Sequence, residues 1–178
     1  CVAGGGCNGY SPPDEGWGRG RRPVIHVNYA DAQSYVAWLS AKTGQRYRLP
    51  AEAEFEYAAR GGTTTAFHTG DDITPEQGNF GELRGRTLPV GSLPPNPFGL
   101  YEINGNVAQW TQDCHHDSYE GAPTDGSAWL TGPCETRDVR GGGWSLGKYT
   151  LRTAQRIGDP PQQRNSHLGF RVVRELRH

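Results

Sequence analysis

The sequence predicts an α+β fold, in which two short helices pack on a small twisted antiparallel sheet and much of the chain is loop. Three observations lead to this prediction. The 178 residues include 26 glycines and 13 prolines and are only 34 % hydrophobic, as expected for a loop-rich domain held by a few large aromatic side chains. Two stretches place apolar residues at helical spacing, and four short apolar runs bounded by turn residues are typical of strands.

The first helix is predicted from the residues at its two ends. Asn28 is a favourable N-cap, because its side chain can accept a hydrogen bond from the first turn. Apolar residues then recur at helical spacing over 32–39, and Gly44 is placed to end the helix in a left-handed conformation. The sequence therefore predicts a helix that ends before Gly44.

The second helix is predicted just after Pro50, a residue that suits a first helical turn. Phe55 and Ala58 provide apolar surface, and Gly61 ends the pattern.

The rest of the chain is expected to hold short strands separated by loops. Residues 1–22 are rich in turn residues and are predicted to be an irregular lead-in, and most of 61–132 is predicted to be loop. The predicted strands are 88–90, 106–112, 138–141 and 170–173. We treat residues 1–178 as a single domain.

Charge and hydropathy restrict the partners. The formal net charge is −1 and the arginines are scattered, so a nucleic-acid partner is not expected. No apolar run approaches the length of a membrane span. Because the chain lacks Met and enters its pattern partway through, we expect the parent protein to extend upstream of Cys1 by roughly half a domain. That segment would decide whether the protein is at the cell surface or in the cytoplasm.

The four cysteines fall into two local pairs, Cys1 with Cys7 and Cys114 with Cys134. Each pair could form a disulfide, and the second bridge would tie a long loop to the body. Unpaired thiols in a cytosolic protein are an equal alternative. Their spacing is unsuited to a structural zinc site.

Three motifs in order are similar to those of one known family. They are RLPAEAEFEYAARGG at 48–62, PPNPFGLYEINGNVAQW at 94–110, and RGGGWSLGKYTLRTAQRIGDPPQQRNSHLGFR at 140–171. Together they resemble the formylglycine-generating enzyme or sulfatase-modifying factor family, and the resemblance runs from about residue 23 to 174. It implies a C-type-lectin-like fold with two helices on a small twisted sheet.

The third motif departs from the family at the catalytic positions. In catalytic members, two cysteines five residues apart follow this glycine-rich turn, bind copper as thiolates and attack the substrate cysteine. The corresponding residues here are Leu146 and Leu151. A leucine side chain can neither bind Cu(I) nor act as a redox partner, so we expect no catalysis of that reaction and no catalytic residues.

The second motif is where family members resemble a calcium site. Gln109 stands where the family has a glutamate, and Glu102 supplies one nearby carboxylate beside the neutral oxygens of Asn104. Calcium prefers several negatively charged oxygens, so these residues predict a weak calcium site or none. The structural alternative is that Gly105 and Asn106 form a turn and Trp110 packs in the core. No other cofactor is implied.

The C-terminal segment is the predicted recognition surface, because the lectin-like architecture places it on the binding face. Its arginines, among them Arg140 and Arg171, are interpreted as scaffold that bonds to loop carbonyls. The residues predicted to bind a protein or small ligand are Ser145, Leu146, Gly147, Tyr149, Thr150, Gln155, Ile157, Asp159, Asn165, Ser166 and His167.

The same segment resembles the variable region of proteins diversified by diversity-generating retroelements. In those proteins, variable codons arise by change at the two adenines of AAC, which gives residues such as Ser, Tyr, Asp and His but not Gln. Most of the predicted positions comply, whereas Gln155 does not.

Three functions follow from these observations. The first is a non-catalytic ligand-binding module, whose surface the retroelement pattern would diversify. The second is an oxygen- or metal-dependent enzyme of the formylglycine-generating enzyme and sulfoxide synthase superfamily. The third is a regulatory domain fused to a signalling kinase. Ser145 with a histidine gives no hydrolase signature, because the sequence lacks GxSxG. The adjacent His115 and His116 are interpreted as exposed loop residues.

Overall fold

The computed structural model describes residues 1–176. Two α-helices and six short strands form a helix-and-sheet arrangement with long connecting loops, in agreement with the predicted α+β class. In chain order, the helices, short 3-10 helices (η) and strands are η1 (Val2–Gly4), η2 (Cys7–Gly9), α1 (Tyr29–Thr43), β1 (Tyr47–Arg48), α2 (Glu52–Arg60), β2 (Ala108–Cys114), β3 (Arg137–Arg140), η3 (Lys148–Leu151), β4 (Ile157–Asp159), β5 (Leu168–Gly169) and β6 (Val173–Arg174).

Helix α1 begins and ends where the sequence predicts. The Asn28 side chain accepts a hydrogen bond from the Asp31 backbone N–H, and the Asp31 carboxylate accepts one from the Asn28 N–H, which completes a capping box. Gly44 closes the helix with φ of 67°. Helix α2 begins after Ala51 and ends at Gly61, so Pro50 lies just before the helix rather than within its first turn.

The main sheet has four strands in the order β4-β3-β2-β5. Strands β2, β3 and β4 pair antiparallel, but β5 pairs with β2 in parallel, so the sheet is mixed and not purely antiparallel as predicted. The chain reaches β5 from the far edge through the loop after β4, which sets the parallel direction. A second, two-stranded sheet pairs β1 with β6.

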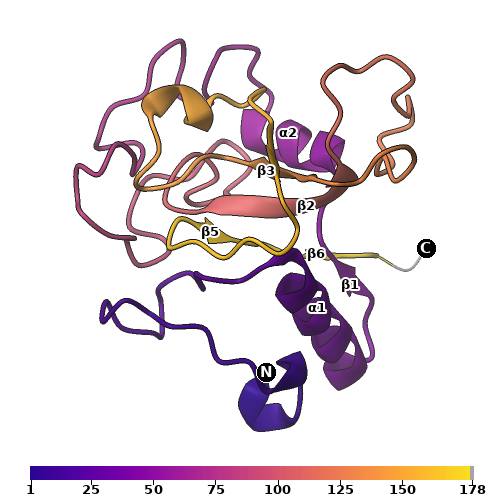
Figure 1. The fold of residues 1–178 in the computed structure, drawn as a ribbon. Coiled ribbons are helices and arrows are strands. Elements are labelled where there is room, and N and C mark those ends of the chain that lie inside the picture. The colour runs from indigo at the N-terminus through magenta and orange to yellow at the C-terminus, as the bar shows by residue number, and fades with distance from the viewer. Residues whose placement is uncertain (177–178) are drawn as a thin grey trace.

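The two helices cover different faces of the main sheet (Figure 1). On the α1 side, Val36 packs in one buried cluster with Trp110 and Val139. On the α2 side, Phe55 packs with Ile103. Trp110 is fully buried and donates to the Val27 carbonyl at 3.0 Å, as its predicted core role requires.

The region between α2 and β2 is held by buried polar side chains instead of regular structure. The predicted strand 88–90 is absent, because the Leu88 N–H donates to the Asn106 side chain and the Val90 N–H donates to the Arg21 carbonyl. Asn96 similarly accepts from Phe98 and Leu100. The predicted strand 170–173 shrinks to β6, which begins only at Val173.

Both cysteine pairs are disulfides. Cys1 is bonded to Cys7, and Cys114 to Cys134. The second bridge joins the end of β2 to the loop that leads into β3. None of the helices in residues 1–176 is long and apolar enough to cross a bilayer.

Candidate recognition surface and family positions

The two residues that correspond to the family's catalytic cysteines follow the glycine-rich turn after β3: Leu146 lies in the loop after the turn, and Leu151 ends η3. Gly142 has φ of 67°, and a Cβ there would lie 2.6 Å from Leu151 Cδ1, so the turn requires glycine to approach the helical turn η3. Leu151 is fully buried in a cluster with Phe67, Ile73 and Phe80. Leu146 is half-buried. The Leu151 position is therefore filled by core packing.

Next to Leu146 a surface is formed by residues from both sides of the turn. We define the 145–149 surface as Ser145, Leu146, Gly147 and Tyr149 together with Asn165, Ser166 and His167. Tyr149 is 67 % exposed, and the other six residues are exposed or half-buried. The Ser145 hydroxyl lies 3.2 Å from His167 Nδ1, which links the two segments.

The His167 side chain is half-buried in this surface, between Ser145 and Asn165. Burial lowers the pKa of His167 below its usual value, and the neighbouring His26 lowers it further. The imidazole is therefore neutral near pH 7, and its Nδ1 can accept a hydrogen bond from the Ser145 hydroxyl. The other ring nitrogen of His167, Nε2, lies 3.4 Å from Asn165 Nδ2.

Several neighbours of this surface come from distant parts of the chain and were not among the predicted residues. The Gly81 N–H donates to the Leu146 carbonyl and the Glu82 N–H donates to the Trp144 carbonyl, which places Leu83, 60 % exposed, on the adjoining loop. Trp17, from the lead-in, makes an edge contact with Trp144 at a centroid separation of 5.3 Å. These contacts join residues more than sixty positions apart, and no local pattern in the sequence indicates them.

Four predicted surface residues lie elsewhere. Thr150 is only 3 % exposed and donates its hydroxyl hydrogen to the Gly147 carbonyl, so it is part of the scaffold and its prediction as a binding residue is wrong. Gln155, Ile157 and Asp159 lie on or beside β4, three strand spacings from β5, which is roughly 14 Å.

The β4 residues also differ in character from a recognition patch. Ile157 is partly buried and packs against the α1-side core. Asp159 is half-buried, and burial raises the pKa of its carboxyl. The Gln155 amide donates to the Arg156 carbonyl. The eleven predicted residues therefore do not form one continuous patch.

The calcium candidates all have protein partners. Both Glu102 oxygens accept backbone N–H donors, Oε2 from Gly91 at 2.8 Å and Oε1 from Ser92 at 2.9 Å and Leu93 at 3.0 Å. The loop over 91–93 thus wraps around the carboxylate, a fixed anion in a nest of amides.

The neutral oxygens of the second motif are used in the same way. Asn104 Oδ1 lies 2.7 Å from His68 Nδ1, and Gln109 Oε1 accepts from Arg171 Nε at 2.5 Å. The positive charge of the Arg171 guanidinium beside Gln109 would repel a calcium ion at that position. In residues 1–176, no three or more His, Cys, Asp or Glu side chains gather in a way that could hold a metal.

The adjacent histidines are not simply exposed. His115 Nδ1 lies 2.5 Å from Asp138 Oδ1, and His116 stacks on Trp129 with ring centroids 3.5 Å apart. They point to different partners, as expected for neighbouring residues on an extended chain.

Comparison with known proteins gives the family context. The model of the sulfatase-modifying factor enzyme 1-like domain matches residues 6–176. The chain is 37 % identical to the serine/threonine-protein kinase pkn1 of Chlamydia caviae over 90 % of its length, and 36 % identical to the formylglycine-generating enzyme of Mus musculus over 87 %. It spans 25 % of the kinase and 45 % of the mouse enzyme.

Two solved structures share the fold. PvdO from Pseudomonas aeruginosa superposes with a TM-score of 0.83 and 44 % identity, over 90 % of this chain and 65 % of PvdO. Treponema denticola variable protein 1 gives a TM-score of 0.78 and 28 % identity, over 92 % of this chain and 74 % of that one. The lectin-like α+β fold expected from the motifs is thereby confirmed. With its three motifs and a match over residues 6–176, the chain belongs to the sulfatase-modifying factor enzyme 1-like domain family.

Proposed function

We propose that this domain is a non-catalytic binding module that recognises a protein or small ligand through the 145–149 surface. The observation that carries the proposal is that no cysteine of this chain is free to act as the family's catalytic thiolate. All four cysteines are joined in disulfides, and the two positions that correspond to the family's catalytic thiolates are leucines. Leu151 is fully buried among aromatic and aliphatic side chains, where it stabilises the turn that presents the surface.

The composition of the surface supports recognition. An exposed tyrosine stands among small and polar residues, a combination that gives contact area and hydrogen bonding at low cost in side-chain entropy. Leu83 on the adjoining loop adds apolar area. The likeness to a Treponema variable protein favours diversification of this segment, and population sequencing of the codons for 140–171 tests that part.

The binding proposal is tested by site-directed photo-crosslinking in extracts of the source organism. A photoreactive phenylalanine analogue replaces Tyr149 in one protein and Tyr57, 71 % exposed on α2, in a matched control. We expect one saturable adduct at position 149 that excess unlabelled domain removes and that Ser145→Trp abolishes. Equal labelling at positions 149 and 57, or labelling that Ser145→Trp leaves intact, would count against the proposal.

A second function, regulation of a fused kinase, is favoured by the 37 % identity to the Chlamydia kinase. The chain covers only a quarter of that protein, so a kinase domain would have to be encoded in the same reading frame. Sequencing the complete gene decides this: a kinase catalytic domain in frame supports regulation, and its absence excludes fusion.

A further inference from the structure

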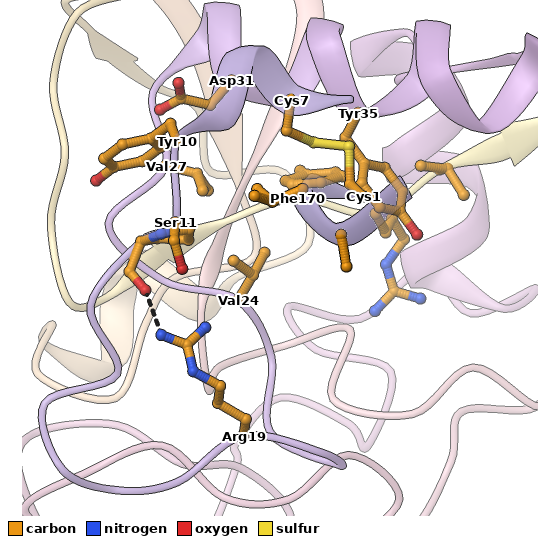
Figure 2. A pocket seen from close by; sticks show the side chains of 15 residues that line it. Cys1, Cys7, Tyr10, Ser11, Arg19, Val24, Val27, Asp31, Tyr35 and Phe170 are labelled. Atoms are coloured by element: carbon orange, nitrogen blue, oxygen red, sulfur yellow. Dashed lines mark hydrogen bonds between the residues drawn. A yellow bond between two sulfur atoms is a disulfide. The ribbon is translucent and has the colours of Figure 1, made fainter. Parts of the chain in front are cut away.

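A cavity of about 550 Å³ lies beside α1, away from the 145–149 surface. Its volume is within the range of small-molecule sites. Five parts of the chain line it: the disulfide-closed segment 1–7, the segment 10–12, residues 19–27, Asp31 and Tyr35 of α1, and the stretch 170–172 before β6. Figure 2 shows the apolar side chains of Val24, Val27 and Phe170 in the lining, with the Cys1–Cys7 bridge and Tyr35 beside Phe170.

The walls are fixed by specific packing. Gly4 and Gly6 lie against the Trp38 ring so closely that a Cβ at Gly6 would clash with it. Tyr35 contacts both Trp38, at 5.7 Å between ring centroids, and Phe170, at 5.3 Å. The bridge between Cys1 and Cys7 closes the segment that rests on these rings. The cavity is therefore largely preformed, which lowers the entropic cost of binding a ligand.

The charged groups around the cavity differ in what they can still bind. Asp31 is engaged by Arg164 through both carboxylate oxygens, at 2.8 and 3.0 Å. Arg171 donates to Gln109 and to the Tyr101 carbonyl. Arg19 donates to the Pro12 carbonyl at 2.8 Å, and its nearest carboxylate, on Asp14, is 3.7 Å away. The guanidinium of Arg19 thus keeps donors that face the cavity mouth (Figure 2).

From this arrangement we infer that the cavity binds a small aromatic carboxylate. The ring lies on Val24, Val27 and Phe170, and the carboxylate pairs with Arg19 at the mouth. Apolar walls favour an aromatic body, because its transfer from water is favourable. Arg19 favours an anionic group, because its guanidinium has donors beyond the one bonded to Pro12, and a guanidinium is suited to grip both oxygens of a carboxylate.

The test uses calorimetric titration with 2-naphthoate and with its neutral counterpart, 2-naphthamide. The same ring in both probes isolates the contribution of the charge. We expect Arg19→Gln to weaken 2-naphthoate binding about fivefold and to change 2-naphthamide binding less than about twofold. Arg84→Gln is the matched control, because Arg84 is also exposed and also donates to a proline carbonyl, that of Pro75.

Two further variants block the space itself. Val24→Trp and Ser11→Trp fill the cavity from two exposed positions in its lining, and each should weaken both probes about tenfold or more. Two variants are used so that misfolding of one does not remove the test. Unchanged affinity for the probes in the folded Trp variants would overturn the inference. It would also be overturned if Arg19→Gln weakened both probes equally, or if Arg84→Gln weakened 2-naphthoate binding as much as Arg19→Gln does. A dimer that dissociates in Val24→Trp would also overturn it, because the cavity would then be a contact between copies.

Discussion

Arg140 and Glu52 form an ion pair inside the domain, with Nη1 2.9 Å from Oε1 and the Arg140 side chain fully buried. The angle at this contact is poor for a hydrogen bond, so the attraction is mainly between charges. Arg140 also pairs with Glu56 at 2.8 Å and donates to the Thr153 carbonyl. The burial of Glu52 outweighs the Arg140 charge and raises the pKa of its carboxyl.

Removal of this guanidinium should strongly destabilise the fold. Arg140→Met leaves Glu52 buried without its cation, and we expect the free energy of unfolding to fall by about 3–5 kcal/mol. Urea denaturation measures the change. Arg46→Met is the control, because the exposed Arg46 pairs with Glu175 at the surface, and it should cost under about 1 kcal/mol. Similar losses for both variants would show that the buried pair is not structurally important.

The division between scaffold and surface gives a second prediction. Trp144 is half-buried, donates to the Ser166 carbonyl at 3.0 Å and contacts Trp17, so Trp144→Ala should cost about 3 kcal/mol. Tyr149→Ala should change stability by under about 0.5 kcal/mol, because most of the ring is exposed. Thermal unfolding of both variants checks this, and equal losses would refute the division.

The pKa of His167 predicts how stability depends on pH. Its folded pKa is lowered, so on acidification the unfolded chain takes up a proton at the usual histidine pKa before the folded domain does. His167 therefore contributes stability that is present above about pH 6.5 and is lost as the pH falls below it. We expect His167→Asn to lose less stability than wild type between about pH 7.5 and 5.5. Parallel pH curves for the two proteins would contradict this assignment.

Glu102 distinguishes a structural carboxylate from a calcium ligand. Because it accepts three backbone N–H bonds, Glu102→Gln should destabilise the domain by about 2 kcal/mol in the absence of calcium. The melting temperature of the wild type should not rise at about 1 mM calcium. A rise with calcium that Glu102→Gln abolishes would instead establish a calcium site.

The parts of the fold that depend on local chemistry could be predicted from the sequence. Both ends of helix α1 could be predicted, because Asn28 and Gly44 cap the helix through bonds to residues only three or four positions away. The prediction of a strand at 88–90 was wrong, because the N–H groups of Leu88 and Val90 bond to the distant Asn106 and Arg21. A pattern that resembles a strand does not reveal a competing side-chain acceptor elsewhere in the chain.

The same reason explains the errors at the site. Glu52 stands in the first turn of α2, where a carboxylate is ordinarily solvated, but it lies against the buried Arg140, more than eighty residues away. Thr150 has the small polar character of a surface residue, yet its turn places it inside, and the pairing of β4 with β3 leaves Ile157 partly buried against the α1-side core. Arg156 likewise lies 3.7 Å from the Asp138 carboxylate and over the ring of Tyr119, two contacts with residues distant in the sequence.

The central claim is that this family member binds without the copper-thiolate chemistry, and a turnover assay tests it most directly. The domain is incubated with Cu(I), oxygen and a cysteine-containing peptide from a sulfatase, and the peptide is analysed by mass spectrometry. The mouse formylglycine-generating enzyme is the positive control. The account predicts that the peptide cysteine remains unchanged. Conversion of that cysteine to an aldehyde by the wild-type domain, whose four cysteines are paired, would contradict it.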